Sequence, residues 1–253
     1  MTKAQNIPLA KDQVGWLKRY VNCTNFIRFY AKSVSISKVF DEDKRGPDCW
    51  RYTVKDGERT KAEVRESGTL DTLGSCNVAD YCCKDGNVIL LLLEFPHYKE
   101  YDGLDPEGMR PIAPAQGSTG SRIRNQLIKK LESCNLETGK EYHVVISNPV
   151  QFQASLYSLH GQSTRGNIKA GSLRDAVWKA LMVREKNNFI ERLKSYDPVI
   201  IINACTKGVT EDVDCLVYEF FFNARKNNVK LPRYFHSSAH PSSWDKYTTI
   251  EEL

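Results

Sequence analysis

The stretch that decides the fold is VILLLL at residues 88–93, which runs directly into EFPH at residues 94–97. Six consecutive apolar residues are typical of a strand buried on both faces of a parallel sheet. Similar runs stand at residues 143–146 and 198–202, with a weaker one at residues 233–236. Helix-like sequence separates these runs, and that alternation is typical of α/β proteins. We therefore expect a three-layer α/β/α sandwich with a central, mostly parallel four-stranded sheet.

Three segments between and after these runs have helical periodicity. Residues 121–131 carry Ile123, Leu127 and Leu131 at a spacing of four. A second helical segment starts near Ser172 and leads to the third strand, and residues 212–226 place their apolar side chains on one stripe.

The region before residue 86 has a different character from the rest of the chain. Residues 9–22 predict an amphipathic helix, and the alternating stretches 26–30 and 50–54 predict strands. We expect residues 1–85 to be an N-terminal extension packed on a core domain of residues 86–253.

Each predicted strand of the core domain ends in polar or turn-forming residues. Glu94 and His97 follow the first strand, Asn148 the second, residues 203–208 the third and residues 237–244 the fourth. In a parallel sheet these carboxyl ends lie on one edge, where ligands bind. The sequence therefore predicts one site built from four distant segments, as in an enzyme or a ligand-binding protein.

Composition narrows the class of protein without naming one. The chain has 253 residues and a net charge of +5, which permits nucleic-acid binding without arguing for it. None of the eight cysteines forms a C-x-x-C pair, so we expect reduced, mostly buried thiols and no metal or cofactor. No apolar run is long enough to span a bilayer and no signal peptide is visible, so we expect a cytoplasmic protein with no membrane partner.

The order of motifs resembles the uracil-DNA glycosylase superfamily. That family has a first strand ending in a G-[QE]-x-P loop, a Pro-rich loop into a helix, a strand ending in Asn, a small-residue loop and a final H-P-S-x-L. The corresponding stretches are LEFPHY (93–98), MRPIAP (109–114), VVISNPV (144–150), NAC (203–205) and HPSSW (240–244). The resemblance covers about residues 86–250.

The resemblance implies hydrolysis of a base–sugar bond in DNA, with the target nucleotide flipped out of the duplex. Asn148 would then bind the Watson–Crick edge of the flipped base, and His240 would stabilise charge on the leaving base. Glu94 or His97 would position water or stabilise the sugar cation. Trp244 falls where the family places an apolar wedge that fills the gap in the base stack.

The resemblance also implies a base pocket and a DNA-backbone surface. The base pocket would be formed by Phe95, Tyr98, Glu107, Asn148 and Phe152. The DNA-backbone contacts would come from Lys207, Ser242, Ser243, Trp244, Arg122 and Arg124. DNA is the partner implied, bound through its phosphates and one flipped base, and we expect the protein to be a monomer.

Two departures from the family pattern change the expected substrate. Phe95 stands where the best-known subfamily has a water-activating Asp, and Glu107 corresponds to the base-stacking Phe. A polar or enlarged pocket would suit a bulky modified pyrimidine better than plain uracil. Bacterial antiphage glycosylases of this superfamily remove hypermodified cytosines from viral DNA, and we expect that activity.

Three other functions stay open. One is uracil removal in base-excision repair, and a second is a catalytically silent DNA-binding protein on the same fold. The third is a hydrolase or transferase for free nucleosides. Structural interpretations are open as well: Asn148 would then only end a strand, Trp244 would only pack, and Arg122 and Arg124 would be the solvated face of a helix.

Overall fold

The described part of the chain folds around a large mixed sheet. The computed structural model describes residues 42–55, 63–66, 87–102, 108, 110–112, 114–154 and 170–253. The predicted helix at residues 9–22 and the predicted strand at residues 26–30 lie outside this part. The predicted strand at residues 50–54 is confirmed within β1.

Seven strands form the sheet in the order β2-β1-β6-β3-β7-β8-β9. Their bounds are β1 Cys49–Lys55, β2 Glu63–Glu66, β3 Val88–Leu92, β6 Glu141–Ser147, β7 Ile200–Asn203, β8 Arg233–Ser237 and β9 Ile250–Glu252. The four predicted strands are the central ones, β6, β3, β7 and β8, and they run parallel. Antiparallel strands β1, β2 and β9 extend the sheet at its two edges. A separate ribbon pairs β4 (Tyr101–Asp102) with β5 (Arg110–Pro111).

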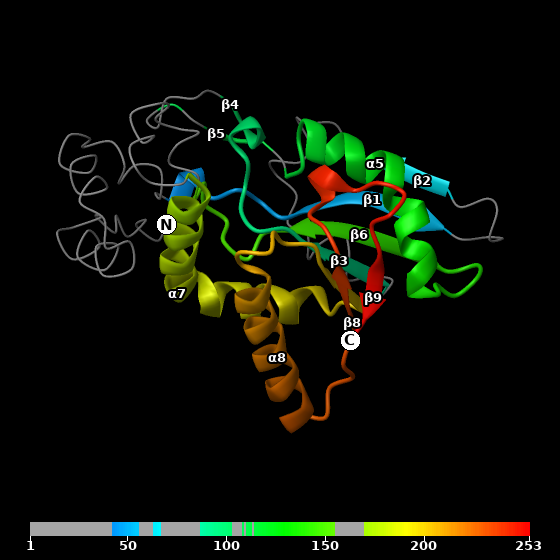
Figure 1. The fold of residues 1–253 in the computed structure, drawn as a ribbon. Coiled ribbons are helices and arrows are strands. Elements are labelled where there is room, and N and C mark those ends of the chain that lie inside the picture. The colour runs from blue at the N-terminus through cyan, green and yellow to red at the C-terminus, as the bar shows by residue number, and fades with distance from the viewer. Residues whose placement is uncertain are drawn as a thin grey trace, which may run out of the picture.

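Helices cover both faces of the sheet (Figure 1). Helix α5 (Ser118–Leu131) packs on one face, and α7 (Ala170–Tyr196) and α8 (Thr210–Lys226) pack on the other. Short 3-10 helices occupy Glu42–Lys44 (η2), Tyr98–Glu100 (η3), Glu132–Cys134 (η4) and Pro241–Ser243 (η6). The predicted three-layer α/β fold is therefore confirmed, and the second helical segment is one continuous helix.

Strand β3 lies at the centre of the core, which explains its unbroken apolar sequence. All five of its residues are buried. Leu90 and Leu92 pack in the cluster under α7 and α8, whereas Ile89 and Leu91 pack in the cluster under α5. A strand with a helical layer on each face has no solvent side, so a polar residue would be costly at any of these positions.

The register of the parallel strands aligns their carboxyl ends. Leu92 of β3 pairs with Ser147 of β6 and with Asn203 of β7, and Asn203 pairs with His236 of β8. The loops that follow these four residues therefore leave the sheet at one edge, as the sequence predicts.

Candidate functional site

The loop after β3 is held against the loop after β7 by the side chain of Glu94. This carboxylate is buried, and its Oε2 accepts a hydrogen bond of 2.7 Å from the backbone N–H of Thr206. Its Oε1 lies 3.6 Å from the Arg174 guanidinium of α7. The backbone carbonyl of Glu94 accepts from the Trp178 indole at 2.7 Å. Glu94 therefore has a fixed position at the sheet edge, with its charge facing one cation.

One ring nitrogen of His240 contacts Ser242, and within the described residues the other nitrogen has no hydrogen-bond partner. Its Nδ1 accepts from the backbone N–H of Ser242 at 3.2 Å and lies 2.9 Å from the Ser242 hydroxyl. Burial lowers the pKa of His240, and the Arg174 charge lowers it further although Glu94 opposes the shift. A neutral ring that accepts at Nδ1 carries its proton on Nε2, so His240 can donate a hydrogen bond to a ligand.

His97 repeats this arrangement on the neighbouring loop. Its Nδ1 accepts from the backbone N–H of Lys99 at 3.2 Å, and its ring lies beside that of Tyr98, tilted by 43° with centroids 4.2 Å apart. Burial lowers the pKa of His97, and the charges of Lys99 and His240 lower it further. The two imidazoles are thus electrostatic neighbours, and both are suited to donate from Nε2 rather than to accept a proton.

Asn148 directly follows β6, and both of its backbone groups are hydrogen-bonded. Its N–H donates to Asp48 at 3.3 Å and its carbonyl accepts from Arg192 at 2.9 Å. The residue is 1% exposed, yet its Oδ1 has no hydrogen-bond partner within the described residues. A buried amide oxygen without a partner is costly, so a ligand with a matching donor would gain from binding there.

The Asn148 backbone is fixed by a buried network around Asp48. The Asp48 carboxylate accepts from Ser147 at 2.9 Å, from Tyr196 at 2.7 Å, from Gln151 at 3.3 Å and from the Arg192 guanidinium. The network joins the start of β1, the end of β6 and the end of α7. Asp48 and Arg192 were not predicted as site residues, because they are 144 positions apart and belong to no motif.

Three predicted phosphate contacts remain accessible, and two helix arginines are exposed. Lys207, Ser242 and Ser243 are exposed beside the Glu94 and His240 loops. Arg122 and Arg124 are exposed on α5, and Arg122 donates to the Trp244 carbonyl at 3.2 Å.

The roles predicted for Trp244 and Phe152 do not fit the positions of these side chains. The Trp244 indole is fully buried and donates to the Ser237 hydroxyl at 2.9 Å, so it cannot insert into a base stack without leaving the core. Phe152 is also fully buried, with the guanidinium carbons of Arg45 and Arg184 at 4.7 and 5.2 Å from its ring centroid. Neither ring can stack on a flipped base in this arrangement.

The remaining predicted base-pocket residues have mixed positions. Phe95 is half-buried and packs against the core cluster under α7 and α8, and Tyr98 is half-buried against His97. Glu107 lies outside the described residues, as does the segment 155–169 of the predicted polar loop.

Arg174 is a further site residue that sequence reasoning missed. Besides facing Glu94, it binds the Asp175 carboxylate at 2.5 Å and the Thr206 hydroxyl at 3.2 Å. It lies in the first turns of α7, at the carboxyl edge of the sheet. A single arginine among polar residues at the start of a helix has no sequence pattern that would identify it as a site residue.

Metal binding has no support in the part of the chain that is described, where no group of three or more His, Cys, Asp or Glu side chains is placed to hold an ion. Cys49, Cys134, Cys205 and Cys215 are free thiols, and only Cys215 among these four is exposed. Within the same residues, no helix is both long and apolar enough to cross a membrane.

The chain matches no model of a known protein family, and no curated protein is similar enough in sequence to count as a relative.

Proposed function

We propose that this chain is a DNA glycosylase that flips a modified pyrimidine, such as a hypermodified cytosine of phage DNA, and hydrolyses its N-glycosidic bond. The observation that carries the proposal is the Asn148 side chain. It is a buried amide whose Oδ1 lacks a partner among the residues that the structure describes, at the sheet edge where Glu94 and His240 also lie. An N–H or exocyclic amine on the edge of a flipped pyrimidine would supply the missing donor.

The proposed reaction needs negative charge near the sugar and a donor near the base. Water would form a bond to C1′ while the C1′–N1 bond breaks and its electron pair stays on the base. Glu94 would stabilise the cationic sugar, and the Nε2–H of His240 would stabilise the negative charge on the base oxygen. His97 would orient the water by donating to it, and the water proton would leave to solvent or to the departing base.

Hydrogen bonds fix the positions of Asn148 and Glu94, which favours catalysis over binding alone. Asn148 is bonded through both backbone groups, and Glu94 through the Thr206 N–H. Groups that are fixed before the substrate arrives need no reorganisation during the reaction. Lys207, Ser242 and Ser243 are exposed beside them, where they would hold the phosphates that flank the flipped nucleotide.

One observation favours a second function, a DNA-binding protein without activity. Phe95 is half-buried against the core and cannot activate water, and the Glu94 carboxylate is engaged by Thr206 and Arg174. Such a protein would retard DNA on a gel and leave no abasic sites.

The test is incubation of the purified chain with uracil-containing, unmodified and fully modified viral DNA, followed by alkali cleavage at abasic sites. Breaks confined to modified DNA would support the proposal, and breaks confined to uracil DNA would make the chain a repair enzyme. DNA retardation without breaks in any substrate would establish the binding function instead.

The Asn148→Ala variant tests the residue on which the proposal depends. We expect it to fold normally, because Oδ1 makes no described hydrogen bond and the backbone bonds remain. Cleavage should fall by about 100-fold or more, as for loss of a positioned hydrogen-bonding group. Asn125→Ala, on the exposed face of α5, is the matched control. Equal cleavage by both variants would remove Asn148 from the mechanism.

A further inference from the structure

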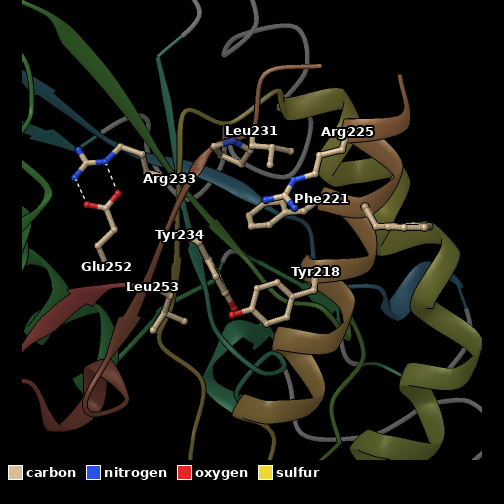
Figure 2. A pocket seen from close by; sticks show the side chains of 10 residues that line it. Tyr218, Phe221, Arg225, Leu231, Arg233, Tyr234, Glu252 and Leu253 are labelled. Carbon is tan, nitrogen blue, oxygen red and sulfur yellow. Dashed lines mark hydrogen bonds and ion pairs between the residues drawn. The ribbon is translucent and has the colours of Figure 1, made fainter. Parts of the chain in front are cut away.

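A hollow lies away from the candidate site, between α8 and the start of β8 (Figure 2). Its volume is about 590 Å³. Tyr218 and Phe221 of α8 and Tyr234 of β8 form its walls, and Leu231 and Leu253 border it. This hollow is at the amino end of β8, whereas the candidate site follows the carboxyl ends of the parallel strands.

Three aromatic rings meet edge to face in this hollow. Ring centroids are 6.2 Å apart for Tyr218 and Phe221, 5.9 Å for Tyr218 and Tyr234, and 5.8 Å for Phe221 and Tyr234. The corresponding interplanar angles are 73°, 81° and 88°. Such a cluster offers both ring faces and ring edges, which favours another aromatic ring as the occupant. Tyr218 is 50% exposed and Leu253 60%, so this apolar surface is open to solvent.

Two arginines line the hollow, and Arg225 is the one without an ion pair in the described part of the chain. The other arginine, Arg233, is neutralised by Glu252 through two hydrogen bonds of 2.7 and 2.5 Å, and Figure 2 shows this pair directed away from the aromatic rings. Arg225 lies beside Phe221, and no carboxylate in the described part of the chain pairs with it. A guanidinium next to apolar rings is suited to bind a planar anion through two parallel hydrogen bonds.

We propose that this hollow binds a small planar aromatic anion, with its ring against Phe221 and Tyr218 and its acidic group on Arg225. The volume falls within the range of small-molecule sites, roughly 300–1,000 Å³. The apolar lining would desolvate the ring, and the Arg225 guanidinium would fix its orientation. This site is independent of the proposed glycosylase activity, because it uses none of the residues assigned to that reaction.

Anilinonaphthalene sulfonate tests the proposal, because it combines a planar aromatic body with one anionic group and fluoresces when bound. We expect saturable binding to the full chain with one site per molecule. Arg225→Gln should weaken this binding by about 10-fold, as loss of one charge-assisted contact does. Tyr218→Ala should weaken it as well, and both side chains are exposed enough for folding to survive.

Two controls make the result specific to this hollow. Lys129→Gln removes an exposed cation on α5, on the opposite face of the sheet, and should leave the binding unchanged. The uncharged probe N-phenyl-1-naphthylamine should lose little affinity in Arg225→Gln, since it has no anionic group. Displacement of the sulfonate by 2-naphthoate or by dAMP would identify an aromatic carboxylate or a nucleotide as the preferred form. Absence of saturable binding, or equal binding by wild type, Arg225→Gln and Tyr218→Ala, would overturn the proposal.

Discussion

Two aspartates, Asp48 and Asp214, accept hydrogen bonds from residues at the carboxyl ends of the strands, and the two carboxylates are stabilised in different ways. Asp48 accepts five hydrogen bonds, one of them from the permanently charged Arg192. Asp214 accepts from Asn203 at 2.8 Å and Tyr234 at 2.5 Å, and pairs with His236 at 2.6 Å. The first carboxylate has a fixed counter-charge, whereas the second relies on neutral donors and one titratable ring.

The two aspartates also differ in the segments that they hold and in their exposure to solvent. Asp48 holds the Asn148 backbone, the centre of the proposed base recognition, and the Asp48 side chain is 2% exposed. Asp214 joins α8 to β7 and β8 and is 16% exposed. A buried charge depends on its partner more strongly than a partly solvated charge does, so the two networks should differ in what their loss costs.

Breaking the Asp48 network should have the largest effect on stability. Asp48→Ala leaves the Arg192 guanidinium, whose side chain is 13% exposed, without its counter-charge, and we expect a loss of about 3–5 kcal/mol in the free energy of unfolding. Urea denaturation followed by circular dichroism measures this loss. The double variant Asp48→Leu/Arg192→Met should recover the part of the loss that the unpaired charge causes, although the donors of Ser147, Gln151 and Tyr196 stay without Asp48. A double variant as unstable as Asp48→Ala would show that packing, and not charge, is what Asp48 supplies.

Breaking the Asp214 network should cost less. Asp214→Ala removes the acceptor of the Asn203 amide and of the Tyr234 hydroxyl but leaves no permanent cation buried. We expect a loss of about 1–3 kcal/mol, the cost of leaving buried neutral donors unpaired. The same urea titration measures it, with Asp212→Ala as the control, because the Asp212–Lys179 pair is solvent-exposed. A loss equal to that of Asp48→Ala would contradict the comparison.

The sheet edge was predictable from sequence because a rule of topology determines it. Four apolar runs placed Glu94, Asn148 and His240 at strand ends along one edge of the sheet without any knowledge of side-chain contacts. The networks behind these residues follow no such rule. Asp48 and Arg192 are brought together by packing alone, and neither lies in a periodic pattern.

The orientation of single aromatic residues was the weakest part of the sequence prediction. Trp244 follows an H-P-S-S stretch at a loop, where an exposed and a buried indole have the same sequence context. Its burial depends on the Ser237 hydroxyl and the Ala239 carbonyl, which accept its N–H at 2.9 and 3.1 Å. Lys130 of α5 is also buried, and its ammonium donates to the carbonyls of Asp245 and Thr248.

A third carboxyl group, that of Glu100, is buried with fewer hydrogen bonds than those of Asp48 and Asp214. Its Oε1 accepts one hydrogen bond, from the Ala115 N–H at 2.9 Å, and its Oε2 has no partner within the described residues. Burial raises the pKa of Glu100 to about 8, well above its ordinary value of 4.5. Backbone hydrogen bonds with Ala115 and His97 and the charge of Arg51 oppose this shift without cancelling it, so the carboxyl is protonated in the folded protein at neutral pH.

Glu100 should therefore make stability fall as pH rises. Between pH 4.5 and 8 the unfolded chain loses this proton and the folded chain keeps it, so the contribution of Glu100 is complete below pH 4.5 and is lost as pH rises to about 8. Glu100→Gln stays neutral and can still accept from Ala115. We expect its stability relative to wild type to increase by about 1 kcal/mol between pH 6 and pH 7, close to the limit for one proton. Urea titrations of both proteins at the two pH values measure this change. A difference that is constant with pH would mean that Glu100 is ionised in the fold and has a charged partner, as Asp48 has.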